Sequence, residues 1–417
     1  MKSLFWPGLF ILIFGFALLP GIRLIAAELK VTSFSKEGKL VFTTPTAGSA
    51  DHHYRVECAT SLVSAAWTTR RSVSGVGALA SVTNGVESAT HSMFYRVVSS
   101  SNSAGFVDGE YMVIDLSGGT GAVTYVVDYY SGASAVPGGV TNDTYKTGKL
   151  VMRKIPKGTF TMGSPSGELG RDSDEMQHQV TLTKDFYIGV FEVTQRQWEL
   201  VMGNNPSYFT NATYYAMRPA EKVSYYDIRE DSAGAISPNW PASSQTHASS
   251  FMGKLRAKTG LFSFDLPTES QWEYACRAGT ATTLNTGYNL TNISTDAHMN
   301  VAGRYPYNGG YINGKTQPAS SCTTANGTAT AGYYLPNAWG LYDMHGNLHE
   351  WCLDWYGTYP DAVSDPAGAA SGAYRVIRGG SWGQGGAFTC RSAIRGIVYP
   401  YYRNSIGIGF RAAMTLP

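Results

Sequence analysis

Residues 266–279 read LPTESQWEYACRAG and predict one short helix with clear ends. Thr268 and Gln271 form a capping box, in which each side chain satisfies a backbone N–H group that the first turn leaves unpaired. Trp272 lies within this helix, and Gly279 ends it because glycine readily adopts the left-handed conformation found after helix C-termini. A second compact stretch, GLYDMHGNLHEW at residues 340–351, predicts a glycine turn that leads into a buried segment.

Further elements extend outward from these two stretches. Apolar runs bounded by turn residues predict strands, and Ser or Thr followed three residues later by Asp or Gln predicts helix starts. The strands are expected within residues 155–164, 179–183 and 186–189, and the helices are expected to begin at Thr194, Ser224 and Phe251. Few helices and many short strands predict an α+β fold.

An ordered set of motifs runs through the same region. It comprises PKGTFTMG at 156–163, EVT at 192–194, RP at 218–219, VS at 223–224, LPTE at 266–269, WEYA at 272–275, GLYDM at 340–344, GN at 346–347, EW at 350–351, RGGSW at 378–382 and GFR at 409–411. This set resembles the sulfatase-modifying-factor family, also called the formylglycine-generating-enzyme family. The resemblance covers residues 149–417 and implies a C-type-lectin-like fold. It does not by itself imply the activity, because one fold hosts many functions.

The resemblance also implies a copper(I) site in the active enzymes. Their two Cys thiolates lie between the Gly-Gly-Ser motif and the next Arg-rich strand, and soft thiolates select Cu(I). In this chain the corresponding segment, residues 383–389, reads GQGGAFT and contains no Cys. We therefore expect no copper and assign no catalytic residue, which leaves enzymatic activity an open question.

The chain contains five Cys, an odd number. The resemblance implies a disulfide between Cys276 and Cys390, because some family members pair the matching positions. Cys58 and Cys322 remain unassigned, and Cys352 is interpreted as a small buried apolar residue between Trp351 and Trp355. No zinc motif accompanies the cysteines.

The glycine turn is a candidate calcium site. The resemblance implies ligands from the carboxylates of Asp343 and Glu350 and the backbone carbonyls of Gly346 and Leu348. Carboxylates and carbonyls are the ligands that Ca²⁺ prefers. Two alternatives remain at this stage: a hydrogen-bonded turn without metal, and a zinc site formed by His345 and His349.

The C-terminal stretch 379–411 is a candidate ligand-binding face. Trp382, Phe388, Tyr401 and Arg403 are interleaved with Gly and Asn, and aromatic residues and Arg dominate recognition hot spots. On a lectin-like scaffold a similar segment forms the exposed ligand face. The alternative is that these aromatic residues fill the core.

The N-terminal part of the chain has a different character. Residues 1–27 combine Lys2, an apolar run and a small-residue cleavage site, which predicts a secretory signal peptide. An uncleaved membrane anchor is the alternative. Residues 28–105 alternate in short runs that predict a small β-sandwich, and 106–148 are interpreted as a linker or hairpin. No later segment is long and apolar enough to span a membrane.

The charge composition of the chain excludes one class of partner. The 32 Lys and Arg against 30 Asp and Glu give a formal net charge of +2, which argues against a nucleic-acid partner. We expect an exported protein, secreted, periplasmic or at the cell surface. Three functions remain open: a binding or accessory module for a peptide, protein or glycan, a formylglycine-generating oxidase, and a structural display protein at the surface.

Overall fold

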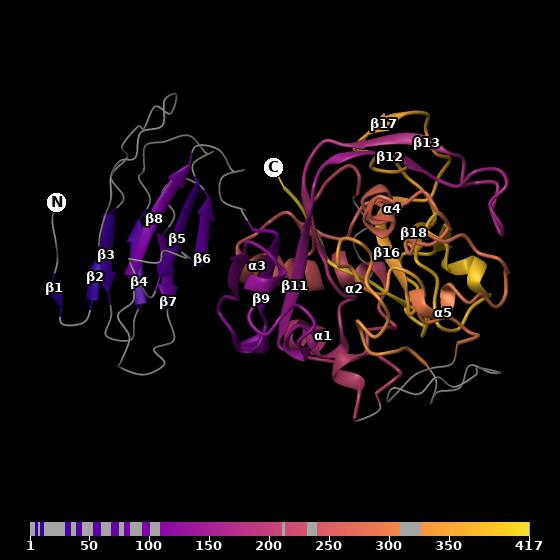
Figure 1. Cartoon of the computed structure of the whole chain (residues 1–417). Coiled ribbons are helices and arrows are strands. Elements are labelled where there is room, and N and C mark those ends of the chain that lie inside the picture. The colour runs from indigo at the N-terminus through magenta and orange to yellow at the C-terminus, as the bar shows by residue number, and fades with distance from the viewer. Residues whose placement is uncertain are drawn as a thin grey trace. The chain divides into compact units, whose positions relative to one another are not determined.

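The computed structural model describes residues 109–210, 213–231, 240–308 and 327–416, and gives strand bounds alone within residues 1–108. The chain divides into two compact units, each shown in Figure 1. Unit 1 comprises Met1–Gly109 and Val126–Ser131, and unit 2 comprises Glu110–Tyr125 and Gly132–Leu416.

The elements that the structure describes in unit 1 are strands. They are β1 (Phe5–Trp6), β2 (Leu9–Ile11), β3 (Lys30–Phe34), β4 (Lys39–Thr43), β5 (His53–Ala59), β6 (Thr68–Ser74), β7 (Leu79–Thr83), β8 (Phe94–Ser100) and β10 (Val126–Tyr130). One sheet has the order β1-β2-β8-β5-β6, and the other has the order β3-β4-β7. The side chains of residues 1–108, Cys58 among them, lie outside the described part of the chain, so the signal peptide and the sandwich stay predictions.

Unit 2 has short strands and short helices. Its strands are β9 (Tyr111–Asp115), β11 (Lys149–Ile155), β12 (Gly158–Met162), β13 (His178–Leu182), β14 (Phe186–Gly189), β15 (Phe264–Asp265), β16 (His349–Trp355), β17 (Val363–Ser364), β18 (Arg375–Arg378), β19 (Gly396–Val398), β20 (Ile408–Gly409) and β21 (Ala413–Thr415). Its α-helices are α1 (Gln195–Met202), α2 (Tyr225–Arg229), α3 (Phe251–Thr259), α4 (Glu269–Arg277) and α5 (Met299–Ala302).

One antiparallel sheet brings together strands from distant parts of the sequence. Its order within unit 2 is β9-β11-β14-β21-β15, so the C-terminal strand β21 lies between β14 and β15. Val151 of β11 pairs with Val113 of β9, within the segment interpreted from sequence as a linker or hairpin. Ile188 of β14 pairs with Ala413 of β21.

A second sheet positions the glycine turn. Its order is β19-β18-β16-β20, and every residue of β16 is buried. Strand β16 pairs antiparallel with β18 and parallel with β20, and a register shift falls between Trp351 and Trp355. Strand β16 therefore places Glu350 in the interior of unit 2.

The predicted helix starts are confirmed. Thr194, Ser224 and Thr268 are each the N-cap of a capping box, with Gln197, Asp227 and Gln271 as the reciprocal partners. Helix α4 ends at Arg277, and Ala278 rather than Gly279 is the left-handed C-cap, at φ 46°. Trp272 of α4 is fully buried in the core with Ile155, Ile188 and Leu341.

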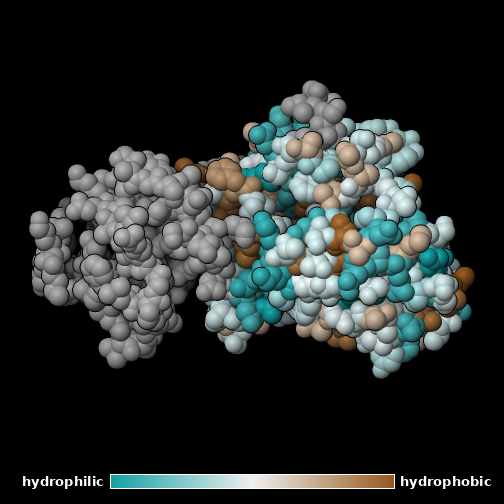
Figure 2. All heavy atoms as spheres, turned by 90° about the horizontal axis from the view of Figure 1, so that it is seen from above, coloured by the Kyte–Doolittle hydropathy of each residue, from teal (hydrophilic) through white to brown (hydrophobic). Residues whose placement is uncertain are grey.

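The surface of unit 2 carries no broad apolar area on the face shown in Figure 2, where apolar residues are scattered among hydrophilic ones. Such scattered exposure is ordinary for a folded domain. None of the helices among the described residues has the length and apolar character needed to cross a bilayer.

Candidate functional site

A tight turn leads into β16 and carries Asp343, Gly346 and Asn347. All three residues have positive φ, at 56°, 75° and 61° respectively. A Cβ atom at Gly346 would lie 2.0 Å from the carbonyl oxygen of Arg304, so only glycine fits at that position. The two non-glycine residues are Asp and Asn, the types that tolerate this conformation best.

Asp343 holds one unpartnered carboxylate oxygen. Its Oδ2 accepts a hydrogen bond from the backbone N–H of Gly332 at 2.6 Å. Its Oδ1 is buried and has no hydrogen-bond partner in the described part of the chain. Burial raises the pKa of Asp343 to about 6. A buried oxygen without a partner calls for an explanation such as a bound ion or water.

Glu350, the other expected carboxylate ligand, already has partners. Arg411 donates from Nε to Oε2 and from Nη2 to Oε1, both at 2.6 Å, and the indole N–H of Trp272 donates to Oε2 at 2.7 Å. Glu350 is therefore not the freely available ligand that the sequence predicted. The physical reason is that a fully buried carboxylate needs a counter-charge, and the chain between β20 and β21 supplies one.

Glu192 adds a third carboxylate to this interior. Its Oε1 accepts from the backbone N–H of Leu348 at 3.0 Å, and its Oε2 accepts from Nδ2 of Asn347 at 2.5 Å. Burial, Asp343 and Glu350 raise the pKa of Glu192 well above its usual value, although Arg411 opposes the shift. Three buried carboxylates thus interact around one guanidinium, an arrangement that favours a bound cation or retained protons.

The two histidines of the turn do not form a shared metal site. His345 uses both ring nitrogens, because Nδ1 lies 2.6 Å from the carbonyl oxygen of Cys390 and Nε2 lies 2.9 Å from the backbone nitrogen of Asn285. Burial lowers the pKa of His345 and of His349 to about 4, so both are neutral at pH 7. His345 is therefore not available as a ligand for the alternative zinc site.

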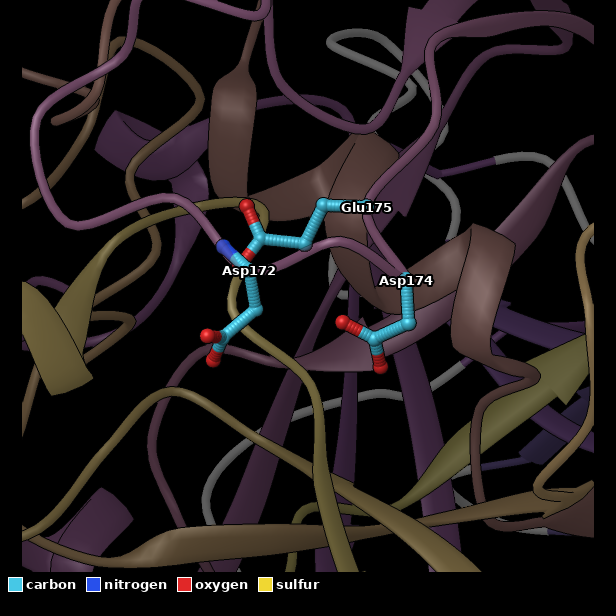
Figure 3. Close-up of side chains that lie close together, drawn as sticks. All are labelled: Asp172, Asp174 and Glu175. Carbon is cyan, nitrogen blue, oxygen red and sulfur yellow. The ribbon is translucent and has the colours of Figure 1, made fainter.

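An acidic cluster lies elsewhere, on the loop before β13. Carboxylate oxygens of Asp172, Asp174 and Glu175 lie within 4.8 Å of one another, and Figure 3 shows the Asp172 and Asp174 carboxylates side by side. Glu175 is paired with Arg391 at 2.6 Å, and Asp174 accepts from the hydroxyl of Tyr356 at 2.8 Å. These partners place Asp174 and Glu175 in a structural network of ion pairs and hydrogen bonds.

The predicted disulfide between Cys276 and Cys390 is absent from the structure, where both are free, buried thiols. The sulfur of Cys276 lies 3.9 Å from Nε2 of His345, whereas the carbonyl of Cys390 faces the other side of the same ring. Cys276 and Cys390 also belong to different apolar clusters. The imidazole of His345 thus contacts both residues, and the structure contains no disulfide between them.

The three described thiols of unit 2 are poor metal ligands. Burial raises the pKa of Cys276 and of Cys390 to about 12, and raises that of Cys352 well above its usual value. A thiolate is the form that binds metal, and these sites disfavour it. Cys352 is fully buried, as expected. Cys322 lies outside the described residues.

The segment 383–389 ends in a short 3-10 helix, Ala387–Cys390. Gln384 is exposed, and its backbone carbonyl accepts from the Thr389 hydroxyl at 3.0 Å. The side chain of Gln384 also hydrogen-bonds to that of His349, which is fully buried. No thiol occurs within this segment.

Two of the predicted ligand residues belong to the interior. Trp382 is 3% exposed and donates its indole N–H to the carbonyl of Ile406 at 2.8 Å. Phe388 is partly buried against the cluster around Tyr305. Trp382 was therefore wrongly placed on an exposed face, because aromatic content alone does not distinguish core from surface.

The other two predicted residues lie at the surface. Tyr401 is 57% exposed and stacks on Tyr399, with ring centroids 5.3 Å apart. The hydroxyls of Tyr399 and Tyr374 are 2.9 Å apart. Nη2 of Arg403 lies 3.4 Å from Asp227. We call Tyr374, Tyr399 and Tyr401 the tyrosine cluster.

Comparison with known proteins identifies the family. A family profile described as "Sulfatase-modifying factor enzyme 1-like domain" matches residues 141–416. The chain belongs to this family. The expected family and the α+β, C-type-lectin-like fold are therefore confirmed.

Individual relatives in the sulfatase-modifying-factor family differ in their names. "Chaperone protein LppX" of Paenibacillus barcinonensis is 32% identical over 217 residues, which cover 49% of this chain and 71% of the relative. "Formylglycine-generating enzyme" of Mus musculus is 26% identical over 278 residues, which cover 61% and 71% respectively. Among solved structures, "Treponema denticola variable protein 1" is 28% identical with a TM-score of 0.48 and covers 64% of this chain and 95% of its own.

Sequence reasoning missed the roles of Glu192 and Arg411. Both stood in motifs that carried the family resemblance, Glu192-Val-Thr and Gly-Phe-Arg411. Each is fully buried, and Arg411 pairs with Glu350 across 61 residues of sequence. The available signal was a charged residue embedded in an apolar motif, which is rarely buried without a partner.

Proposed function

We propose that this protein is an exported binding or accessory module in which the family fold operates without the copper chemistry of its oxidases. The observation that carries the proposal is the lack of any Cys in the segment 383–389. The buried thiols of Cys276, Cys352 and Cys390 offer no replacement, because burial holds each in the protonated form at neutral pH.

The tyrosine cluster is the proposed ligand face. Tyr399 and Tyr401 stack on each other, and Tyr374 contacts Tyr399 by ring and hydroxyl. Rings held in this way lose little conformational freedom on binding, so they provide contact area at low entropic cost. Arg403, with a side chain 48% exposed, lies on the same C-terminal segment and adds hydrogen-bond donors. The ligand class is a peptide, protein or glycan.

The name of the Paenibacillus relative supports an accessory role. That protein is called a chaperone and is similar to this chain over 71% of its own length. A chaperone function needs a surface that binds another protein, and it needs no redox centre. The same comparison leaves the oxidase alternative standing, because a formylglycine-generating enzyme also matches. A structural display role at the cell surface is the third candidate.

Calcium is proposed as a structural ion at the glycine turn. The residues present fit a dication, because Asp343 has an unpartnered buried oxygen and three carboxylates share one guanidinium. Asp343 would be the principal ligand, with the carbonyls of Gly346 and Leu348 as the others, whereas Glu350, held by Arg411 and Trp272, would add negative charge beside the ion. The ion would neutralise the excess negative charge of this interior.

A binding screen with matched variants tests the ligand face. The wild-type protein is screened against immobilised peptides and glycans, and each bound compound is then titrated with Tyr401→Ala and Tyr399→Ala. Loss of an anchoring aromatic should weaken binding about tenfold or more. Tyr288→Ala is the control, because Tyr288 is 56% exposed and belongs to a different loop. Equal losses in the control, or bound compounds indifferent to both variants, would refute the assignment.

A further inference from the structure

A small aromatic cluster lies beside the glycine turn. Phe209, Leu348 and Trp382 form its buried members, and the rings of Phe209 and Trp382 meet edge to face at 5.0 Å. The guanidinium of Arg218 lies 5.6 Å from the centre of the Phe209 ring. Phe209 thus contacts both an indole and a cation in the interior of unit 2.

Several unpartnered buried polar atoms belong to residues that contact the members of this cluster or adjoin them in sequence. They are Nε and Nη2 of Arg218, Oε2 of Glu221, Oγ1 of Thr328, Nδ1 of His349 and Oγ of Ser381, none of which has a partner in the described part of the chain. Ser381 precedes Trp382 and His349 follows Leu348 in sequence. Native structures leave few buried polar atoms without partners, so each of these atoms calls for a partner such as an ordered water or a bound ligand.

Of these groups, the charged guanidinium of Arg218 most needs a binding partner. It is 1% exposed, and burial lowers its pKa to about 10, so the guanidinium is still charged at neutral pH. An uncompensated charge in the interior is strongly destabilising. Neutral water would satisfy the two N–H groups and leave the charge uncompensated.

Glu221 does not neutralise Arg218 by direct pairing. Its Oε1 accepts hydrogen bonds from the backbone N–H groups of Tyr208 and Phe209, and no hydrogen bond joins it to Arg218 among the described residues. Burial raises the pKa of Glu221 to about 7, which makes the carboxylate only partly ionised near neutrality. Among the described residues, Glu221 therefore offers Arg218 the charge of a partly ionised carboxylate and no hydrogen bond.

Thr328 lies close to the same place. A Cβ atom at its neighbour Gly327 would lie 2.2 Å from the Phe209 ring, so this backbone packs directly against the ring. Ala331 donates its backbone N–H to the carbonyl of Met217, the residue before Arg218, at 2.8 Å. The segment 327–331 thus runs from Phe209 to Met217, the neighbour of Arg218, and carries the unpartnered hydroxyl.

We propose that Arg218 and Thr328 form a binding site for a small carboxylate. Nε and Nη2 are adjacent donors on one edge of the planar guanidinium, and they match the two oxygens of a carboxylate in a bidentate pair. The Thr328 hydroxyl donates to one of the same oxygens. The site is separate from the tyrosine cluster and does not depend on what that surface binds.

Burial limits the ligand to a compact one. Phe209 and Trp382 are each 3% exposed, so the surrounding wall leaves no open groove for a chain. Formate and acetate present the required charge and geometry with little additional bulk. They are therefore the probes of choice, with chloride as a spherical anion of equal charge.

Thermal unfolding in each salt tests the site. Wild type, Arg218→Lys and Thr328→Val are titrated with sodium formate or acetate against sodium chloride at constant ionic strength. A ligand that binds only the folded state raises the melting temperature in a saturable way. Arg218→Lys keeps the positive charge and lacks the paired N–H donors of the guanidinium, so the rise in melting temperature with formate or acetate should disappear. Thr328→Val should weaken the apparent affinity for these anions about fivefold to tenfold.

Arg375→Lys is the matched control. Arg375 is also fully buried with an unpartnered Nε, but its other nitrogens donate to the carbonyls of Leu353 and Trp240. Its replacement should leave the carboxylate effect intact. An equal saturable effect of chloride, or an undiminished carboxylate effect in Arg218→Lys, would overturn the proposal. If Arg218→Lys fails to fold, Thr328→Val decides, and an unchanged affinity in that variant would likewise overturn it.

Discussion

At the scale of single residues, Asp354 shows how burial controls ionisation in this protein. It is fully buried in β16 and accepts the backbone N–H of Glu269 at 2.8 Å. Burial, followed by the nearby Glu269, raises the pKa of Asp354 from 3.8 to about 7. Between these values the folded state binds a proton that the unfolded state has lost, so this group destabilises the fold progressively as pH rises from about 4 to 7.

The variant Asp354→Asn tests this linkage. The amide keeps an acceptor for the Glu269 N–H and cannot ionise, so the pH-dependent destabilisation should vanish. The slope removed is at most about 1.4 kcal/mol per pH unit. Denaturant unfolding at intervals from pH 4 to 7 measures it, with the exposed Asp361→Asn as control. Parallel pH profiles for wild type and Asp354→Asn would show that Asp354 ionises normally in the folded protein.

Asp343 provides the test of calcium. With calcium at about a hundred times its dissociation constant, the melting temperature of wild type should rise by roughly 5 °C over that in chelator. Asp343→Ala should not respond, because it lacks the principal carboxylate. Asp172→Ala should respond like wild type, since its neighbours Glu175 and Asp174 are held by Arg391 and Tyr356. If Asp172→Ala instead loses the rise in melting temperature with calcium, the calcium site lies in the acidic loop before β13.

At the scale of elements, the N-caps were the most predictable features. A capping box is local, since its two side chains lie three residues apart, and the helix starts predicted at Thr194, Ser224 and Thr268 match the structure. The pairing of β9 with β11 was not predictable in the same way. Its partners Val113 and Val151 are separated by residues that sequence patterns describe as Gly-rich turns, and no local signal specifies a long-range register.

Helix α4 allows the local contribution to be measured. The hydroxyl of Thr268 accepts from the backbone N–H of Gln271 at 3.1 Å. Thr268→Ala removes this cap and should lower the free energy of unfolding by about 1 kcal/mol. Thr358→Ala, at an exposed loop position, is the control and should change stability by less than about 0.5 kcal/mol. A loss no larger than the control's would mean that tertiary packing alone holds the start of α4.

The candidate site was predictable only in part. Asp343 and Gly346 were found because the turn is local, whereas the pairing of Glu350 with Arg411 depends on β16 and β20 lying side by side. The burial of Trp382 was not predictable for the same reason, because Trp382 packs against Phe209, which is far away in sequence. Local patterns specify turns and caps, and long-range packing specifies which side chains reach solvent.

At the scale of the whole molecule, the described thiols are free, in contrast to the disulfide expected between Cys276 and Cys390. Cys276, Cys352 and Cys390 are fully buried and unpaired. A thiol reagent should therefore label none of the three in the folded protein and all three after unfolding without reductant, as peptide mapping would detect. Labelling of Cys276 and Cys390 only after reduction would show that the two residues form a disulfide.

The central claim is that the family scaffold here operates without the copper oxidase site. Mass spectrometry of a sulfatase-type Cys peptide, incubated with the purified protein, copper and oxygen, tests it most directly. We predict no formylglycine, because the segment 383–389 has no thiolate to hold copper beside the substrate thiol. Copper-dependent turnover that persists in Cys390→Ser would contradict the claim and establish the protein as an oxidase.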